Sequence, residues 1–121
     1  MMQLKHWQDP VNAIPKVVAS RSLKEPLTWN AKLLKGDFAE SVAALKKEPG
    51  RNLVMYGCGE AAHHLWKRGL VDELRCWTHP VVFGTGERLF HSKDPVKMQL
   101  AGSTTFSSGI TLMCFKPPVS R

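Results

Sequence analysis

The sequence has few of the residues and segments that crosslink a chain, bind a structural metal or anchor a protein in a membrane. Only three of its 121 residues are cysteines, and Cys58, Cys76 and Cys114 are widely spaced, without a Cys-x-x-Cys pair. This pattern indicates neither a disulfide framework nor a thiolate zinc site. No apolar run approaches the roughly 20 residues of a membrane helix, and residues 1–10 lack a signal-peptide pattern. We expect a water-soluble protein of the reducing cytoplasm, with no membrane association and no metal.

Acidic residues are also scarce. The chain has ten Asp and Glu residues and seventeen Lys and Arg residues, which gives a net charge of +7. The basic residues are scattered, since the longest runs are the pairs Lys46–Lys47 and Lys67–Arg68, and no basic stripe is interleaved with aromatic residues. We therefore expect no nucleic-acid partner. The alternatives are a well-solvated basic surface and an affinity for anionic small molecules.

The N-terminal part of the chain predicts one strand and one helix. Residues 17–19 form a short apolar run of strand type, which ends on the polar residues 20–22. Asp37 is a helix N-cap, and Glu40 three residues later is its reciprocal partner. Pro49 and Gly50 stop this helix.

The middle of the chain predicts a strand, a glycine turn and a second helix. Residues 52–56, Asn-Leu-Val-Met-Tyr, are of strand type and are followed by Gly57 and Gly59. The helix after the turn ends at Gly69, and Leu70 is placed to pack back on its last turn.

From residue 71 onward the pattern favours strands. Residues 71–86 are a long strand-type run interrupted at Pro80, which suggests a bulge, a bend or an edge. Residues 96–106 and 109–116 predict a hairpin whose loop contains Gly109, a residue able to take a positive φ. The whole predicts an α/β fold of one domain, residues 1–121, with a mostly parallel sheet flanked by helices and an antiparallel C-terminal hairpin.

The glycine turn is a candidate anion site. A strand that passes through Gly57 and Gly59 into a helix leaves backbone N–H groups at the helix N-terminus, which attract phosphate. A Cβ would hold a diphosphate away from this backbone. The alternative is a turn that only lets a strand enter a helix, and Glu60 favours it because its carboxylate would repel a phosphate.

Ser20, Arg21 and Ser22 form a second candidate site at the end of an earlier predicted strand. The carboxyl ends of neighbouring parallel strands share one edge of a sheet, and ligands bind there. A guanidinium flanked by two hydroxyls suits a phosphate. The alternative is a solvated strand end.

Other reactive side chains are weaker candidates. His63 and His64 are adjacent on a helix and so point about 100° apart, which suits a solvent-facing or interface role better than a metal. His79 is more typical of a packed, hydrogen-bonded histidine than of an acid catalyst. Cys58 lies at a helix N-terminus but has no base beside it in the sequence, and we interpret it as a small residue that fills the turn.

Five segments carry a family resemblance. "PKVVASRSL", "LLKGD", "VMYGCGE", "GLVDELRCWTHPVVFGTGERLF" and "TTFSSGITLMCFKP", in this order and at these spacings, resemble the dihydrofolate reductase-like superfamily. They are most similar to the C-terminal reductase domain of the bifunctional riboflavin-biosynthesis enzyme. The resemblance extends from about residue 7 to residue 118, nearly the whole chain.

The resemblance implies a dihydrofolate reductase-like fold that binds NADPH and acts as a homodimer on a pteridine or ribosylamino-pyrimidine-like substrate. It implies that Ser20, Arg21 and Ser22 contact the phosphate end of the cofactor. It assigns the diphosphate-binding turn to Gly57, Cys58, Gly59, Glu60 and Ala61. It further implies that Thr78 lines the substrate and nicotinamide cleft, with His79 beside it.

One departure from the family accompanies the match. Members of the family carry a first strand and helix, and then a "GRxTY"-like segment, before the point where this chain begins. We therefore expect an N-terminally truncated member whose sheet has a gap that exposes unpaired backbone groups. This predicts a dimer with rearranged or exchanged elements. The alternative function is a non-catalytic dimeric remnant that serves as a binding or interaction module.

Overall fold

The computed structural model describes residues 10–90 and 92–118, and residues 1–9, which were searched for a signal peptide, lie outside this part. The chain divides into two compact units, Met1–Pro49 and Gly50–Arg121, and each is described by itself. Within the described residues, no helix has both the length and the apolar character needed to cross a membrane.

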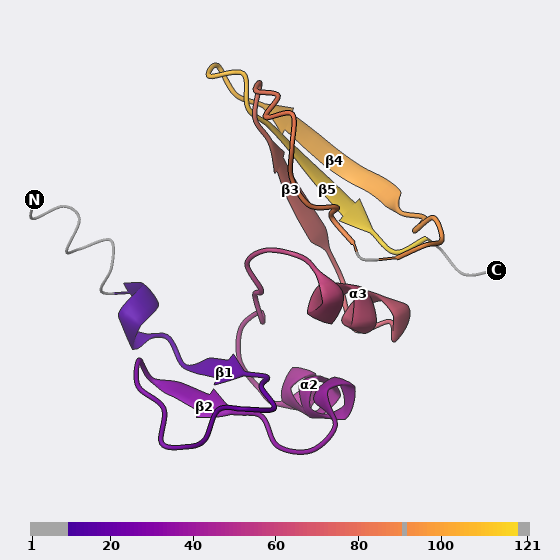
Figure 1. Ribbon diagram of the computed structural model, residues 1–121. Coiled ribbons are helices and arrows are strands. Elements are labelled where there is room, and N and C mark those ends of the chain that lie inside the picture. The colour runs from indigo at the N-terminus through magenta and orange to yellow at the C-terminus, as the bar shows by residue number, and fades with distance from the viewer. Residues whose placement is uncertain (1–9, 91, 119–121) are drawn as a thin grey trace, which may run out of the picture. The chain divides into compact units, whose positions relative to one another are not determined.

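The N-terminal unit contains a short helical turn at residues 10–13, a small parallel sheet and helix α2 (Figure 1). Strand β1 (Lys16–Val18) pairs in parallel with β2 (Ala31–Leu33), with Lys16 opposite Ala31 and Val18 opposite Leu33. The loop between them ends in Trp29 and Asn30, which both have positive φ. The Lys16 ammonium binds the carbonyls of Asn12, Ile14 and Trp29 at 2.9–3.2 Å, which fixes the chain before both strands.

Helix α2 (Phe38–Lys47) forms where the capping pattern predicts it. The Asp37 carboxylate accepts a hydrogen bond from the Glu40 backbone N–H at 2.9 Å, so Asp37 is the N-cap. The helix ends with Lys46 and Lys47 in its last turn, before Pro49. It buries Ala39, which is 3% exposed.

The C-terminal unit contains helix α3 (Glu60–Lys67) and an antiparallel sheet. The helix ends as predicted: Gly69 has φ +71, its N–H bonds the Trp66 carbonyl at 3.1 Å, and the Leu70 N–H bonds the Leu65 carbonyl at 3.0 Å. Leu65 is 6% exposed. Among the described residues, Ala39 and Leu65 are the apolar residues that are buried.

Three strands make the antiparallel sheet, in the order β3-β5-β4 (Figure 1). They are β3 (Leu74–Thr78), β4 (Gln99–Thr105) and β5 (Thr111–Lys116). The predicted C-terminal hairpin is therefore confirmed, with an irregularity between Leu100 and Gly102. Its loop is closed by the Phe106 N–H to Ile110 carbonyl bond of 2.9 Å, and Gly109 has φ +93.

Three expectations for the fold are corrected. Residues 52–56, predicted to be a strand, have no strand structure, because no neighbouring strand pairs with them among the described residues. The strand-type run after residue 71 stops at Thr78, before Pro80, and does not resume at residues 81–86. The sheet is not mostly parallel: one parallel pair lies in the N-terminal unit, and the larger sheet is antiparallel.

Candidate functional site

The glycine turn at the start of α3 has the backbone conformation that glycine allows. Gly57 has φ +83 and Gly59, the N-cap, has φ +140, both in the region that L side chains rarely adopt. A Cβ built at either glycine would meet no atom within 4 Å, so the space beside the turn is open. The backbone of the turn is accessible to a ligand.

The N-terminus of α3 is not closed by a side chain. The first backbone bond of the helix runs from the His63 N–H to the Gly59 carbonyl at 2.9 Å, and no side chain caps the first turn. The first-turn N–H groups, Glu60 and Ala61 among them, have no partner within the helix. The Glu60 side chain adds a negative charge at the same end.

Cys58 lies between the two glycines and is exposed. Desolvation of its sulfur raises the pKa of the Cys58 thiol above the ordinary value. A raised pKa keeps the thiol protonated near neutral pH and opposes a nucleophilic role. The geometry agrees with the interpretation of Cys58 as a small residue within the turn.

Cys76, in the middle of β3, is half-buried, and burial is the first cause that raises the pKa of its thiol. The charges of Cys58 and Cys114 raise this pKa further. The glycine turn and β3 both belong to the C-terminal unit.

Thr78 and His79 line a cavity of about 540 Å³ at the end of β3. The other walls are apolar and come from Trp77, Val81 and Phe83, which are 56%, 59% and 86% exposed, so the cavity is open to solvent. The chain bends around Pro80, where the Val81 N–H bonds the His79 carbonyl at 2.8 Å. The indole of Trp77 stacks on the Phe106 ring, with ring centroids 5.6 Å apart and an angle of 13°.

The three apolar walls were not predicted as site residues. Val81 and Phe83 belong to the run that the sequence pattern assigned to a strand, and the pattern gave Trp77 no role. A signal was present in Pro80, because a proline that ends a strand turns the following apolar residues away from the sheet. That turn makes a concave surface beside Thr78.

Ser20, Arg21 and Ser22 follow β1 in a turn of the N-terminal unit. The Ser20 hydroxyl oxygen accepts hydrogen bonds from the backbone N–H groups of Ser22 at 3.2 Å and Leu23 at 3.1 Å. Ser20 therefore organises this turn, and Arg21 is exposed on it. Joint binding of one ligand by this turn and by the glycine turn stays a prediction, because the two lie in different units.

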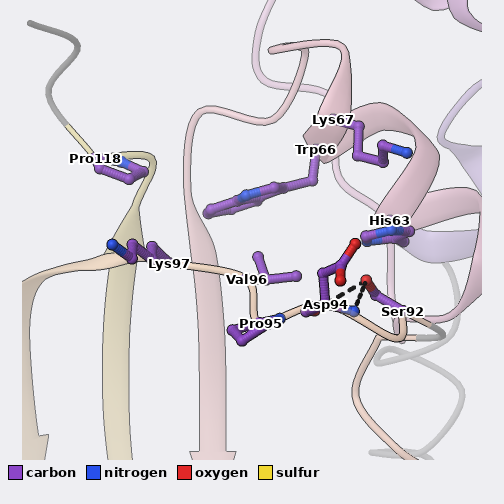
Figure 2. Close-up of a pocket in the computed structure, with 9 residues that line it drawn as sticks. All are labelled: His63, Trp66, Lys67, Ser92, Asp94, Pro95, Val96, Lys97 and Pro118. Atoms are coloured by element: carbon purple, nitrogen blue, oxygen red, sulfur yellow. Dashed lines mark hydrogen bonds between the residues drawn. The ribbon is translucent and has the colours of Figure 1, made fainter.

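A second cavity, of about 400 Å³, lies between α3 and residues 92–97 (Figure 2). His63 packs against the Phe90 ring at 5.6 Å, and Trp66 packs against the same ring at 5.9 Å. The His63 Nδ1 atom is shielded from solvent and has no hydrogen-bond partner among the residues that the structure describes. The described residues hold no group of three or more His, Cys, Asp or Glu that could bind a metal ion. His63 is therefore part of an aromatic contact within the C-terminal unit, and its expected solvent-facing or interface role stays a prediction.

The structure defines an α/β protein with an open glycine turn before α3, and comparison with known proteins identifies its family. Residues 2–112 match the RibD C-terminal domain, and the chain belongs to this family. The resemblance to the riboflavin-biosynthesis reductase domain is thereby confirmed.

The chain is similar to two uncharacterised proteins of Bacillus subtilis (strain 168). It is 34% identical to YyaP over 106 residues, which are 87% of this chain and 56% of YyaP. It is also 34% identical to YwjB over 71 residues, which are 58% of this chain and 41% of YwjB. The chain thus spans about half the length of the curated relatives it matches.

A solved structure has the same fold. It is the crystal structure of a protein from Shewanella sp. PV-4 named "Putative riboflavin biosynthesis protein". The TM-score is 0.66 with 20% sequence identity, and the match covers 98% of this chain and 68% of that protein. At this identity the likeness supports the fold alone.

Proposed function

We propose that this protein is an NADPH-dependent reductase that acts on a pteridine or ribosylamino-pyrimidine-like substrate. The observation that carries the proposal is the open glycine turn at the N-terminus of α3, in a member of the RibD C-terminal domain family. When bound, NADPH supplies the hydride. The residues of this chain bind and orient the two reactants.

The turn fits a diphosphate on three counts. Gly57 and Gly59 take positive-φ conformations, and the space beside each of them is open. The helix dipole adds a partial positive charge at this end. No side chain occupies the cap position. The residues that would hold the diphosphate are Gly57, Cys58, Gly59, Glu60 and Ala61, through their backbone.

The cavity at the end of β3 fits an aromatic heterocycle. Trp77, Val81 and Phe83 give it apolar walls, while the Thr78 hydroxyl and the His79 imidazole supply polar groups that can orient a ring. Its volume of about 540 Å³ is in the range of small-molecule sites. The glycine turn and this cavity both lie in the C-terminal unit. That placement suits a cofactor and a substrate that must meet.

Thermal melting with NADPH tests the proposal. We expect NADPH at one hundred times its dissociation constant to stabilise the protein by about 2.7 kcal/mol, with a corresponding rise in Tm. Gly57→Val or Gly59→Val should remove the rise, because a Cβ at positive φ distorts the turn and blocks the diphosphate.

Gly36→Val is the matched control. Gly36 also has a positive φ, of +78, and open space around it, but it lies before α2 in the N-terminal unit. This variant should melt at a lower temperature and still respond to NADPH. No rise in the wild-type protein would refute NADPH binding, and a rise that survives in Gly57→Val would place the cofactor elsewhere.

The second candidate is a non-catalytic dimeric binding module. Glu60 favours it, because a carboxylate in the first turn of α3 opposes a bound phosphate. Oxidation of NADPH in the presence of a ribosylamino-pyrimidine substrate separates the two functions. Turnover excludes the module, whereas NADPH binding without turnover of any such substrate favours it.

A further inference from the structure

The indole wall of the cavity at the end of β3 contacts a ring that comes from the other side of the sheet's central strand. Trp77 of β3 and Phe106, which follows β4, stack with ring centroids 5.6 Å apart and an angle of 13° between the rings. Strand β5 lies between β3 and β4 (Figure 1), so the two side chains meet across it. The pair is nearly parallel, which is one of the favoured arrangements of aromatic rings.

The strand register places both rings on the same face of this sheet. Trp77 and Thr104 are each opposite Leu112 of β5, so these three side chains point to one face. The Phe106 N–H donates to the Ile110 carbonyl at 2.9 Å, which continues the ladder past the end of β4. Phe106 is two residues beyond Thr104 and therefore points to that face as well. Local sheet geometry alone brings Phe106 to Trp77.

Phe106 supports the indole from the side away from the cavity. It stacks on the ring of Trp77 but is not one of the residues that line the cavity. The indole face that Phe106 covers is therefore turned away from the cavity. The opposite indole face is the one that forms the cavity wall.

The hairpin loop contacts the cavity at a second point. The Gly109 N–H donates to the Phe106 carbonyl at 2.9 Å, and a Cβ at Gly109 would lie 3.2 Å from Cγ of Pro80. The same short loop thus touches Trp77 and Pro80, which flank the two polar residues of the cavity, 78 and 79. The loop fixes both ends of the segment that would orient a ring.

We propose that Trp77 is the stacking wall for a fused two-ring heterocycle and that Phe106 is the positioning residue that holds the indole in this orientation. The inference rests on the proposed function and narrows its substrate to the pteridine class. A two-ring heterocycle covers more of an indole than a single pyrimidine ring does, and it completes a stack of three rings. The Thr78 hydroxyl and the His79 imidazole then bond nitrogen and oxygen atoms at the edge of the heterocycle.

Isothermal titration calorimetry with lumazine and uracil tests the stacking wall. Both probes contain the same dione ring, and only lumazine has the second, fused ring. Lumazine should bind the wild-type protein more tightly than uracil does. Trp77→Leu should weaken lumazine binding by about 5- to 150-fold, the range for loss of one base–aromatic stack, and should weaken uracil binding by less. The measurement needs no NADPH.

Phe106→Leu tests the positioning role, because it keeps an apolar side chain and removes the stacked ring. Lumazine binding should weaken by about 2- to 10-fold, and the near-ultraviolet circular dichroism of the indole should change. Phe106→Tyr restores the ring and should bind lumazine as the wild type does. Phe90→Leu is the matched control: Phe90 is the ring partner of Trp66 in the same unit, at 5.9 Å, and lies outside this cavity. It should leave lumazine affinity unchanged.

Three results would overturn the inference. Absence of lumazine binding, or equal binding of lumazine and uracil, would exclude a two-ring stacking site. Unchanged lumazine affinity in Trp77→Leu would exclude the indole as its wall. A loss in Phe90→Leu as large as that in Phe106→Leu would trace the effect to general destabilisation and remove the positioning role. The melting experiment with NADPH is independent of all three, so a failure here and a failure of cofactor binding are told apart.

Discussion

At the scale of single residues, Glu60 is where the stability of the helix and the proposed binding of a diphosphate conflict. Its carboxylate lies in the first turn of α3, where a negative charge stabilises the helix by about 0.3–1 kcal/mol. The same charge repels a phosphate bound at that helix end. In the proposed complex with NADPH, Glu60 therefore stabilises the helix and weakens the binding of the diphosphate.

We predict that Glu60→Gln binds NADPH more tightly, by roughly 2- to 5-fold, because 0.3–1 kcal/mol of repulsion is removed. Without ligand, the variant should melt slightly below the wild type. Isothermal titration calorimetry measures the affinity. Glu40→Gln, which removes the corresponding acidic residue of α2, is the matched control and should leave NADPH affinity unchanged. Weaker binding by Glu60→Gln would mean that its carboxylate contacts the ligand favourably.

Predictions for single residues succeeded where the backbone conformation alone determines which residue fits. Gly57, Gly59 and Gly109 all have a positive φ, as their places in turns imply. The role of Ser20 was harder to predict, because a hydroxyl that could bind phosphate can also accept its own backbone N–H groups, and here it does. The direction of the pKa shift of Cys58 was also hard to predict. Desolvation by the folded surroundings raises this pKa, and the position of Cys58 at the N-terminus of a helix does not reveal that effect.

At the scale of elements, the C-terminal hairpin depends on one glycine. Gly109 has φ +93, and a Cβ there would lie 3.2 Å from Cγ of Pro80, the residue that ends the strand-type run of β3. The hairpin loop and the Pro80 bend are therefore packed together. This contact helps to hold the wall of the candidate substrate cavity.

Gly109→Ala should destabilise the protein by about 1–2 kcal/mol, because an L residue is strained in this conformation and its methyl group crowds Pro80. Urea unfolding measures the change. Gly102→Ala, in β4 of the same hairpin, has no positive φ and no atom within 4 Å of the new methyl group. It should be neutral or slightly stabilising. Equal effects of the two variants would contradict the packing of the loop on Pro80.

The helices and the hairpin were predictable because their signals are local. The Asp37 cap, the Gly69 stop and the short loop before β5 each lie within a few residues of the element they define. Residues 52–56 were predicted wrongly because a strand needs a neighbour that its own sequence cannot supply. Strand β2 was not predicted at all: it is three residues long and has an Ala-Lys-Leu sequence without a β-branched residue.

At the scale of the whole molecule, the family was recognisable from the sequence while the arrangement of its sheets was not. Five segments spread over the chain carry the resemblance, and the family match over residues 2–112 confirms it. The mostly parallel sheet was expected from the alternation of strands and helices. The structure instead pairs β1 with β2 in one unit and β3 with β5 in the other, since residues 52–56 contribute no strand.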